Sequence, residues 1–180
     1  MYRGLGVISI SIIWLGLLFL IREWPGNRSM TFSQHAARSR VALVYYFILF
    51  ASTMPLFYLF MTRWFVPVFH LPAIFVRIYT VGIILQMIAV TIPETKGTKV
   101  LIHRNSAFMM SLLLMPLLTI VLMSSYISVA ARATSAVALV IQIVIAVITI
   151  PKNGYHKNIL FLQAAYIAVF HIAILTAVYT

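Results

Sequence analysis

The sequence TIPETKGTKVLIHRNSAF, residues 91–108, separates two long apolar runs and carries one of the chain's two acidic residues, three basic residues and a histidine. Each flanking run is continuous in its apolar character and has the length of about 20 residues that a helix needs to cross a bilayer. Inside lipid every backbone polar group must be satisfied within the protein, which helices and closed barrels achieve. The apolar residues do not alternate with polar ones, as barrel strands require. The stretch therefore predicts a polar turn between two membrane helices.

The composition of the whole chain agrees with this prediction. Of 180 residues, 63% are hydrophobic and 8% are charged, whereas a soluble domain usually carries about 25% charged residues. Too little polar surface is present to cover a water-soluble globule, so the main solvent of the protein is lipid. We expect an all-α integral membrane protein.

Six apolar segments are long enough to be spans. The first lacks a small-residue cleavage site before the polar residues that follow it, so we expect a retained span rather than a removed signal peptide. The segments form one transmembrane domain over residues 1–180, with spans at about 5–21, 41–61, 72–92, 106–126, 134–150 and 158–179.

The basic residues predict the orientation of the bundle. The chain carries 13 Lys and Arg against two acids, a formal net charge of +11. Under the positive-inside rule, the connections with more Lys and Arg face the cytoplasm, which places both termini on the outer side. Basic residues beside apolar runs favour contact with anionic lipids over nucleic acid. The first, third and fifth connections hold nine bases (Arg22, Arg28, Arg38, Arg40, Lys96, Lys99, Arg104, Lys152 and Lys157), and the remaining segments hold four (Arg3, Arg63, Arg77 and Arg132).

Few polar residues lie within the predicted spans, and each is a candidate for function because polar groups at depth cost free energy. Arg77 can extend its side chain to the outer interface, or share the outer half of the membrane with His171 in a small anion-binding pocket. Glutamine and histidine side chains in spans also serve as hydrogen-bonding partners between helices. The full set is Arg77, Gln86, Gln142, Gln163 and His171.

Several kinds of chemistry lack the residues that they need. No carboxylate lies in a predicted span, which disfavours ion-coupled transport, and no lysine does, which disfavours a retinal Schiff base. The sequence has no cysteine, no aspartate and no HExxH or Walker motif. We expect no metal site and no cofactor.

The stretch at residues 91–108 also contains the best catalytic candidates. Glu94 closes the third predicted span and His103 opens the fourth, so a carboxylate and an imidazole meet at one interface and could act as acid and base. The alternative is a polar connector whose charges only set the orientation. The bases that could hold an anionic headgroup or another anion there are Arg104, Lys96, Lys99, Arg38 and Arg40.

Three segments resemble a family of six-span bacterial and archaeal membrane proteins related to the Frag/DRAM/Sfk-like superfamily. They are the basic connection REWPGNRSMTFSQHAARSRV, the acid Glu94 in TIPETKG, and the histidine His103 in LIHRNSAF. The resemblance implies a bacterial or archaeal cell membrane and a role that involves lipid.

Three functions remain open from the sequence. The first is a non-enzymatic helical bundle that binds lipid or acts as a subunit, with partner membrane proteins or further copies of itself. The second is a lipid-modifying enzyme that uses Glu94 and His103. The third is an anion channel or uniporter that uses Arg77 and His171.

Overall fold

Six helices long and apolar enough to cross a membrane make up most of the chain, which confirms the predicted fold class. The computed structural model describes residues 2–94, 97–150 and 157–180. Two shorter helical segments, η1 and α4, prolong the second long helix, and a third, α2, precedes it. The elements are α1 (Tyr2–Glu23), α2 (Phe32–Ala36), α3 (Arg40–Phe60), η1 (Met61–Phe65), α4 (Val66–Val68), α5 (Ala73–Thr91), α6 (Thr98–Met123), α7 (Val129–Thr149) and α8 (Ile159–Tyr179).

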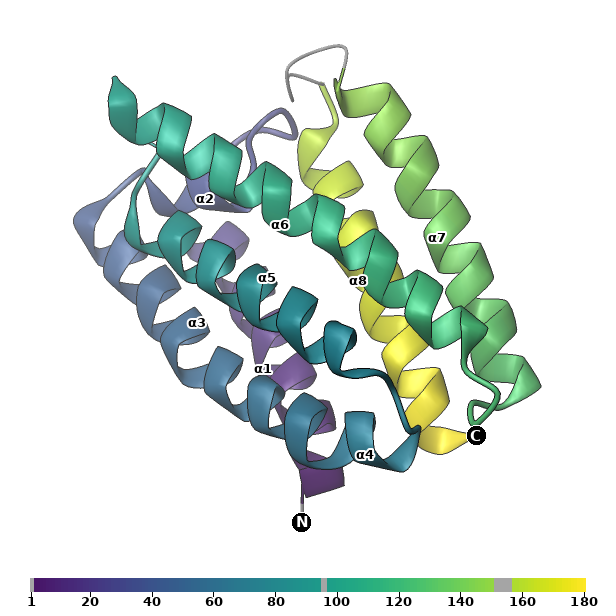
Figure 1. Cartoon of the computed structure of the whole chain (residues 1–180). Helices are drawn as coiled ribbons and strands as arrows, with labels where there is room; N and C mark the ends of the chain where they lie inside the picture. Colours follow the sequence, from purple (N-terminus) through teal and green to yellow (C-terminus); the bar gives the residue numbers. More distant parts are fainter. Residues whose placement is uncertain (1, 95–96, 151–156) are drawn as a thin grey trace.

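The six long helices form a closed ring. Each long helix packs against the next one along the chain, from α1 on α3 to α7 on α8, and α8 also contacts α1. Both termini lie at one end of the bundle, and α2 lies at the other end with the start of α6 (Figure 1). We call these the termini end and the α2 end. This arrangement is the one expected for an even number of spans.

Side chains that cap the helices explain several boundaries. Ser39 accepts a hydrogen bond from the Ala42 N–H at the start of α3, and Ser128 accepts one from the Ala131 N–H at the start of α7. Gly97 precedes α6 with a φ of 63°, which favours glycine. These caps place helix starts earlier than apolarity alone predicted.

Three predicted boundaries differ most from the structure. The second span does not end near residue 61, because a π-helical turn continues the helix to Val68. The fourth begins at Thr98 rather than at 106, so its first two turns include Thr98, Lys99, His103, Arg104 and Asn105. The fifth begins at Val129 rather than at 134. Apolar windows locate the lipid-facing part of a helix and miss polar turns that extend beyond it.

Aromatic packing fills the termini end of the bundle. Phe60, Phe65 and Phe75 are fully buried there, with Leu118 of α6 and Ile174 of α8 in the same core cluster.

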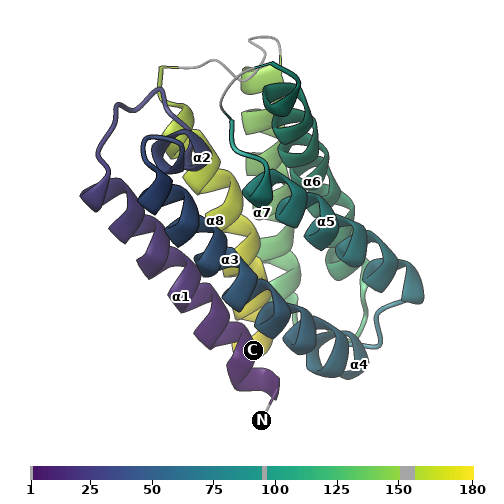
Figure 2. The ribbon, with the colours of Figure 1, turned by 90° about the vertical axis from the view of Figure 1, so that its left-hand side faces the viewer.

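The outer surfaces of the helices are also apolar, as lipid requires. On α7, the exposed residues Val137, Val140, Val144 and Val147 recur at helical spacing along one stripe. Figure 2 shows α1, α3 and α8 on one side of the bundle and α5, α6 and α7 on the other.

Candidate functional site

The short helix α2 carries polar side chains inward from the first connection. Thr31 and Gln34 form a capping box: the Thr31 hydroxyl accepts from the Gln34 N–H, and the Gln34 carboxamide oxygen accepts from the Thr31 N–H. The Phe32 N–H donates to Oε1 of Gln163 on α8 at 3.0 Å. The bond to Gln163 ties α2 to α8, and α2 also packs against α1 and α3.

Glu94 lies just beyond the end of α5 and is buried, with a side chain that is 6% exposed. Its Oε1 accepts from Arg104 Nε at 2.7 Å and from Gln34 Nε2 at 3.1 Å. Its Oε2 lies 3.3 Å from Ser33 Oγ, which has a single proton and makes a shorter contact, at 2.9 Å, with His103 Nε2. A buried carboxylate needs such partners because desolvation of an unpaired charge is costly.

His103, in the second turn of α6, is held at both ring nitrogens. Nδ1 lies 2.8 Å from the carbonyl oxygen of Ile92, and Nε2 lies 2.9 Å from Ser33 Oγ. A carbonyl oxygen only accepts, so we assign the proton of the neutral ring to Nδ1, which leaves Nε2 to accept from the Ser33 hydroxyl. Glu94 Oε2 is 3.9 Å from the same Nε2.

We refer to these side chains together as the polar cluster. The structure brings Glu94, His103 and Arg104 together, as the sequence predicted. Glu94 Oε2 lies 3.9 Å from His103 Nε2, and the Ser33 hydroxyl makes the shorter contact to the imidazole. Ser33, Thr31 and Gln34 were not predicted, although the capping-box pattern T-x-x-Q was a signal for them. The members of the polar cluster are Thr31, Ser33, Gln34, Glu94, His103 and Arg104.

A cavity of about 670 Å³ extends from the polar cluster into the bundle. Its volume lies within the range of roughly 300–1,000 Å³ that is typical of small-molecule sites. All six long helices contribute to the lining, which is apolar over most of its length. We call it the central cavity. Beyond the cluster its walls include Phe50, Met54 and Phe57 of α3, Leu113 and Leu117 of α6, and Ile167 and Phe170 of α8.

His171 and Tyr79 are among the further polar side chains that line the central cavity. His171 Nδ1 accepts a hydrogen bond from the indole N–H of Trp14 at 3.1 Å. The Tyr79 hydroxyl is buried and has no hydrogen-bond partner among the residues that the structure describes. The cavity thus has a strongly polar end and a long apolar part with isolated polar groups.

The other polar residues of the predicted spans lie in three kinds of place: the cavity wall, the buried interior and the surface. Gln86 and Gln163 line the central cavity. Gln142 is fully buried and donates from Nε2 to the Tyr166 carbonyl oxygen at 3.1 Å. Arg77 is exposed on α5 and does not line this cavity, whereas His171 does.

The predicted headgroup-binding bases lie close to the polar cluster in the chain. Arg104 belongs to the cluster, while Arg38, Arg40 and Lys99 are exposed. Lys96 lies outside the described residues. Within the described ranges, no group of three His, Cys, Asp or Glu side chains is placed to hold a metal ion.

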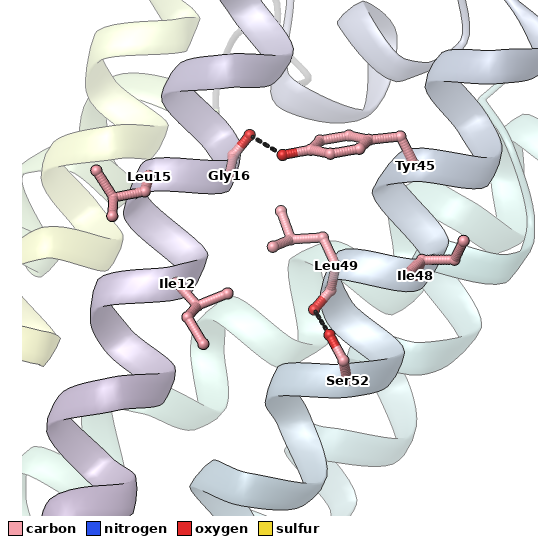
Figure 3. Close-up of a pocket in the computed structure, with 7 residues that line it drawn as sticks. All are labelled: Ile12, Leu15, Gly16, Tyr45, Ile48, Leu49 and Ser52. Carbon is pink, nitrogen blue, oxygen red and sulfur yellow. Dashed lines mark hydrogen bonds between the residues drawn. The ribbon is translucent and has the colours of Figure 1, made fainter.

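A second hollow lies between α1 and α3 and has different properties. It measures about 470 Å³ and is lined mainly by apolar residues. Figure 3 shows that its polar groups bond within the protein: the Tyr45 hydroxyl donates to the Gly16 carbonyl oxygen at 3.1 Å, and the Ser52 hydroxyl donates to that of Leu49 at 3.1 Å. This groove offers no group for chemistry.

The fold and the site define an integral membrane protein of six helices that encloses an amphipathic cavity. Comparison with protein-family models, curated proteins and solved structures gives no match to the chain. The resemblance to the Frag/DRAM/Sfk-like superfamily, and with it the kind of cell membrane, therefore stays a prediction.

Proposed function

We propose that the protein binds one molecule of a lipid-like amphiphile in the central cavity. The headgroup lies at the polar cluster and the hydrocarbon lies among the apolar walls. The observation that carries this proposal is the joining of both environments in one cavity of about 670 Å³. A ligand for such a site must be polar at one end and apolar along the rest of its length.

The charge at the α2 end favours an anionic headgroup. The bases there outnumber the acids, and one of them, Arg104, lines the central cavity beside its salt-bridge partner Glu94. The same excess supports a cytoplasmic location for the α2 end under the positive-inside rule. The described charged residues at this end are Arg22, Glu23, Arg28, Arg38, Arg40, Glu94, Lys99, Arg104 and Lys157.

Native mass spectrometry of the protein purified in mild detergent tests this proposal. We expect one lipid to remain on each protein chain after the detergent is removed. Recovery of a lipid-free chain would overturn the proposal. The same spectrum reports whether the chain is a monomer, a homo-oligomer or part of a complex with another membrane protein.

A further inference from the structure

Ser33 and His103 have the geometry of an activated nucleophile and its base. Ser33 Oγ lies 2.9 Å from His103 Nε2, within the range of 2.6–3.2 Å over which a base can take the proton of a nucleophile. Both residues are buried, and both line the central cavity. We infer that Ser33 and His103 cleave an acyl ester of the bound amphiphile, an activity that rests on the proposed binding function.

The surroundings of His103 suit it to this role. The Ile92 carbonyl oxygen, 2.8 Å from Nδ1, fixes both the ring and the tautomer, so that Nε2 faces Ser33 without a proton. Glu94 Oε2, 3.9 Å from Nε2, stabilises the positive charge that His103 acquires when it takes the proton. Glu94 is therefore a positioning and electrostatic residue, and it does not contact the reacting bond.

The position of Ser33 identifies the bond that it attacks. Ser33 lies where the polar cluster meets the apolar wall of the central cavity, and its neighbour Phe32 also lines that cavity. In an acylated lipid the ester group occupies the same kind of boundary, between headgroup and hydrocarbon. A lipid bound as proposed places its ester carbonyl beside Ser33 Oγ.

The reaction that follows is acyl transfer to serine and then to water. Ser33 Oγ bonds to the carbonyl carbon while its proton passes to His103 Nε2, and the π electron pair moves to the carbonyl oxygen. The C=O bond re-forms, the ester C–O bond breaks, and the departing alcohol takes the proton from His103. Water then attacks the carbonyl carbon of the acyl-serine in the same way, with His103 taking its proton. The bond to Ser33 Oγ breaks, which releases a carboxylic acid and restores the Ser33 hydroxyl.

A donor for the carbonyl oxygen is also present. Gln34 lines the central cavity, and its carboxamide is oriented because Oε1 accepts from the Thr31 N–H. Its Nε2 donates one N–H to Glu94. The second N–H can donate a hydrogen bond to the carbonyl oxygen of the ester and stabilise the negative charge that develops there.

A long-chain alkyl fluorophosphonate tests this inference. The reagent phosphonylates an activated serine: Oγ bonds to phosphorus and fluoride leaves. Its alkyl chain fits the apolar part of the cavity. We expect labelling of the detergent-purified protein at Ser33, identified by peptide mass spectrometry. Release of 4-methylumbelliferone from its palmitate ester should accompany this reactivity and should stop when the protein is labelled.

Variants separate catalysis from structure. Ser33→Ala should abolish labelling, and His103→Gln should slow it by at least about 100-fold, the lower limit for loss of a general base. Ser106→Ala is the matched control, because Ser106 is a buried serine on the same helix as His103 and does not line the central cavity. It should label at the wild-type rate.

The outcomes distinguish this inference from the binding proposal. A wild-type protein that retains its lipid but resists the fluorophosphonate overturns the catalytic inference and leaves binding intact. A label on any residue other than Ser33 also overturns it, even if the Ser33 variant fails to fold. A protein that neither retains lipid nor becomes labelled overturns both proposals.

Discussion

Arg104 Nε lies 2.7 Å from Glu94 Oε1, and this contact joins the start of α6 to the end of α5 at the polar cluster. The carboxylate is 6% exposed, whereas the Arg104 side chain is 37% exposed. The pair lets a negative charge remain buried beside Ser33 and His103.

Replacing Arg104 should destabilise the fold because it leaves the buried Glu94 charge without its counter-ion. Breaking a fully buried pair costs about 3–5 kcal/mol, and the partial exposure of Arg104 lowers our expectation for Arg104→Met to about 2–3 kcal/mol of unfolding free energy. Denaturant unfolding of the detergent-purified protein measures this change.

A double-mutant cycle supplies the control for this prediction. Glu94→Gln combined with Arg104→Met removes both charges, so the double variant should be more stable than the sum of the two single effects predicts. Additivity to within about 0.5 kcal/mol would show that the two charges do not depend on each other.

The buried Gln142 and the half-buried Gln163 should respond in opposite ways to the same substitution. Gln142 Oε1 is buried without a hydrogen-bond partner among the described residues, so Gln142→Leu removes an unsatisfied acceptor. Gln163 Oε1 accepts from the Phe32 N–H, so Gln163→Leu leaves a backbone donor unpaired and releases α2 from α8.

We expect Gln142→Leu to be neutral or stabilising, and Gln163→Leu to cost about 1–2 kcal/mol of unfolding free energy. Gln163→Leu should also slow fluorophosphonate labelling, since α2 carries Ser33. Thermal unfolding and labelling rates of both variants check this pair. Equal losses of stability in the two variants would contradict it.

The sequence was sufficient to predict the membrane architecture because the prediction rests on the apolar character of whole segments. Many apolar residues in each span contribute to it, and no single side chain decides it. The Glu94 and His103 site was also predictable in part, because both residues lie at the ends of spans that a short connection joins.

The sequence was not sufficient to predict the partners of that site. Ser33 and His103 are 70 positions apart, and their contact depends on the way α2 folds inward against α8. A helix of five residues has too few apolar positions to give a periodic signal. Its capping box predicts a helix start and leaves the direction of the following side chains open.

The glycines offer a test of the central cavity. Gly82 lines the cavity, and a Cβ added there would meet no atom within 4 Å. Gly4 has equally open surroundings but does not line the cavity. A leucine side chain at position 82 should therefore enter the cavity and compete with the bound lipid.

We expect Gly82→Leu to lower lipid retention about tenfold, which corresponds to about 1.4 kcal/mol of binding free energy. Gly4→Leu should retain lipid as the wild type does. Native mass spectrometry of both variants measures the bound fraction. Equal retention in the two variants would place the lipid outside the central cavity.

The absence of cysteine from the chain allows its topology to be mapped with single introduced thiols. The exposed Lys99 lies in the first turn of α6 at the α2 end, and Thr180 lies at the termini end. Val140 is 60% exposed near the middle of α7, where its surroundings should be lipid.

A membrane-impermeant maleimide should label Thr180→Cys in intact cells and Lys99→Cys only after the membrane is opened, because the excess of bases places the α2 end in the cytoplasm. Val140→Cys should resist the reagent in both preparations and react after denaturation, since a thiol in hydrocarbon does not meet a water-soluble reagent. Labelling of positions 99 and 180 from one compartment would require an even number of crossings between them, in place of the three that α6, α7 and α8 provide. Labelling of position 140 in the intact membrane would mean that the valine stripe of α7 faces water.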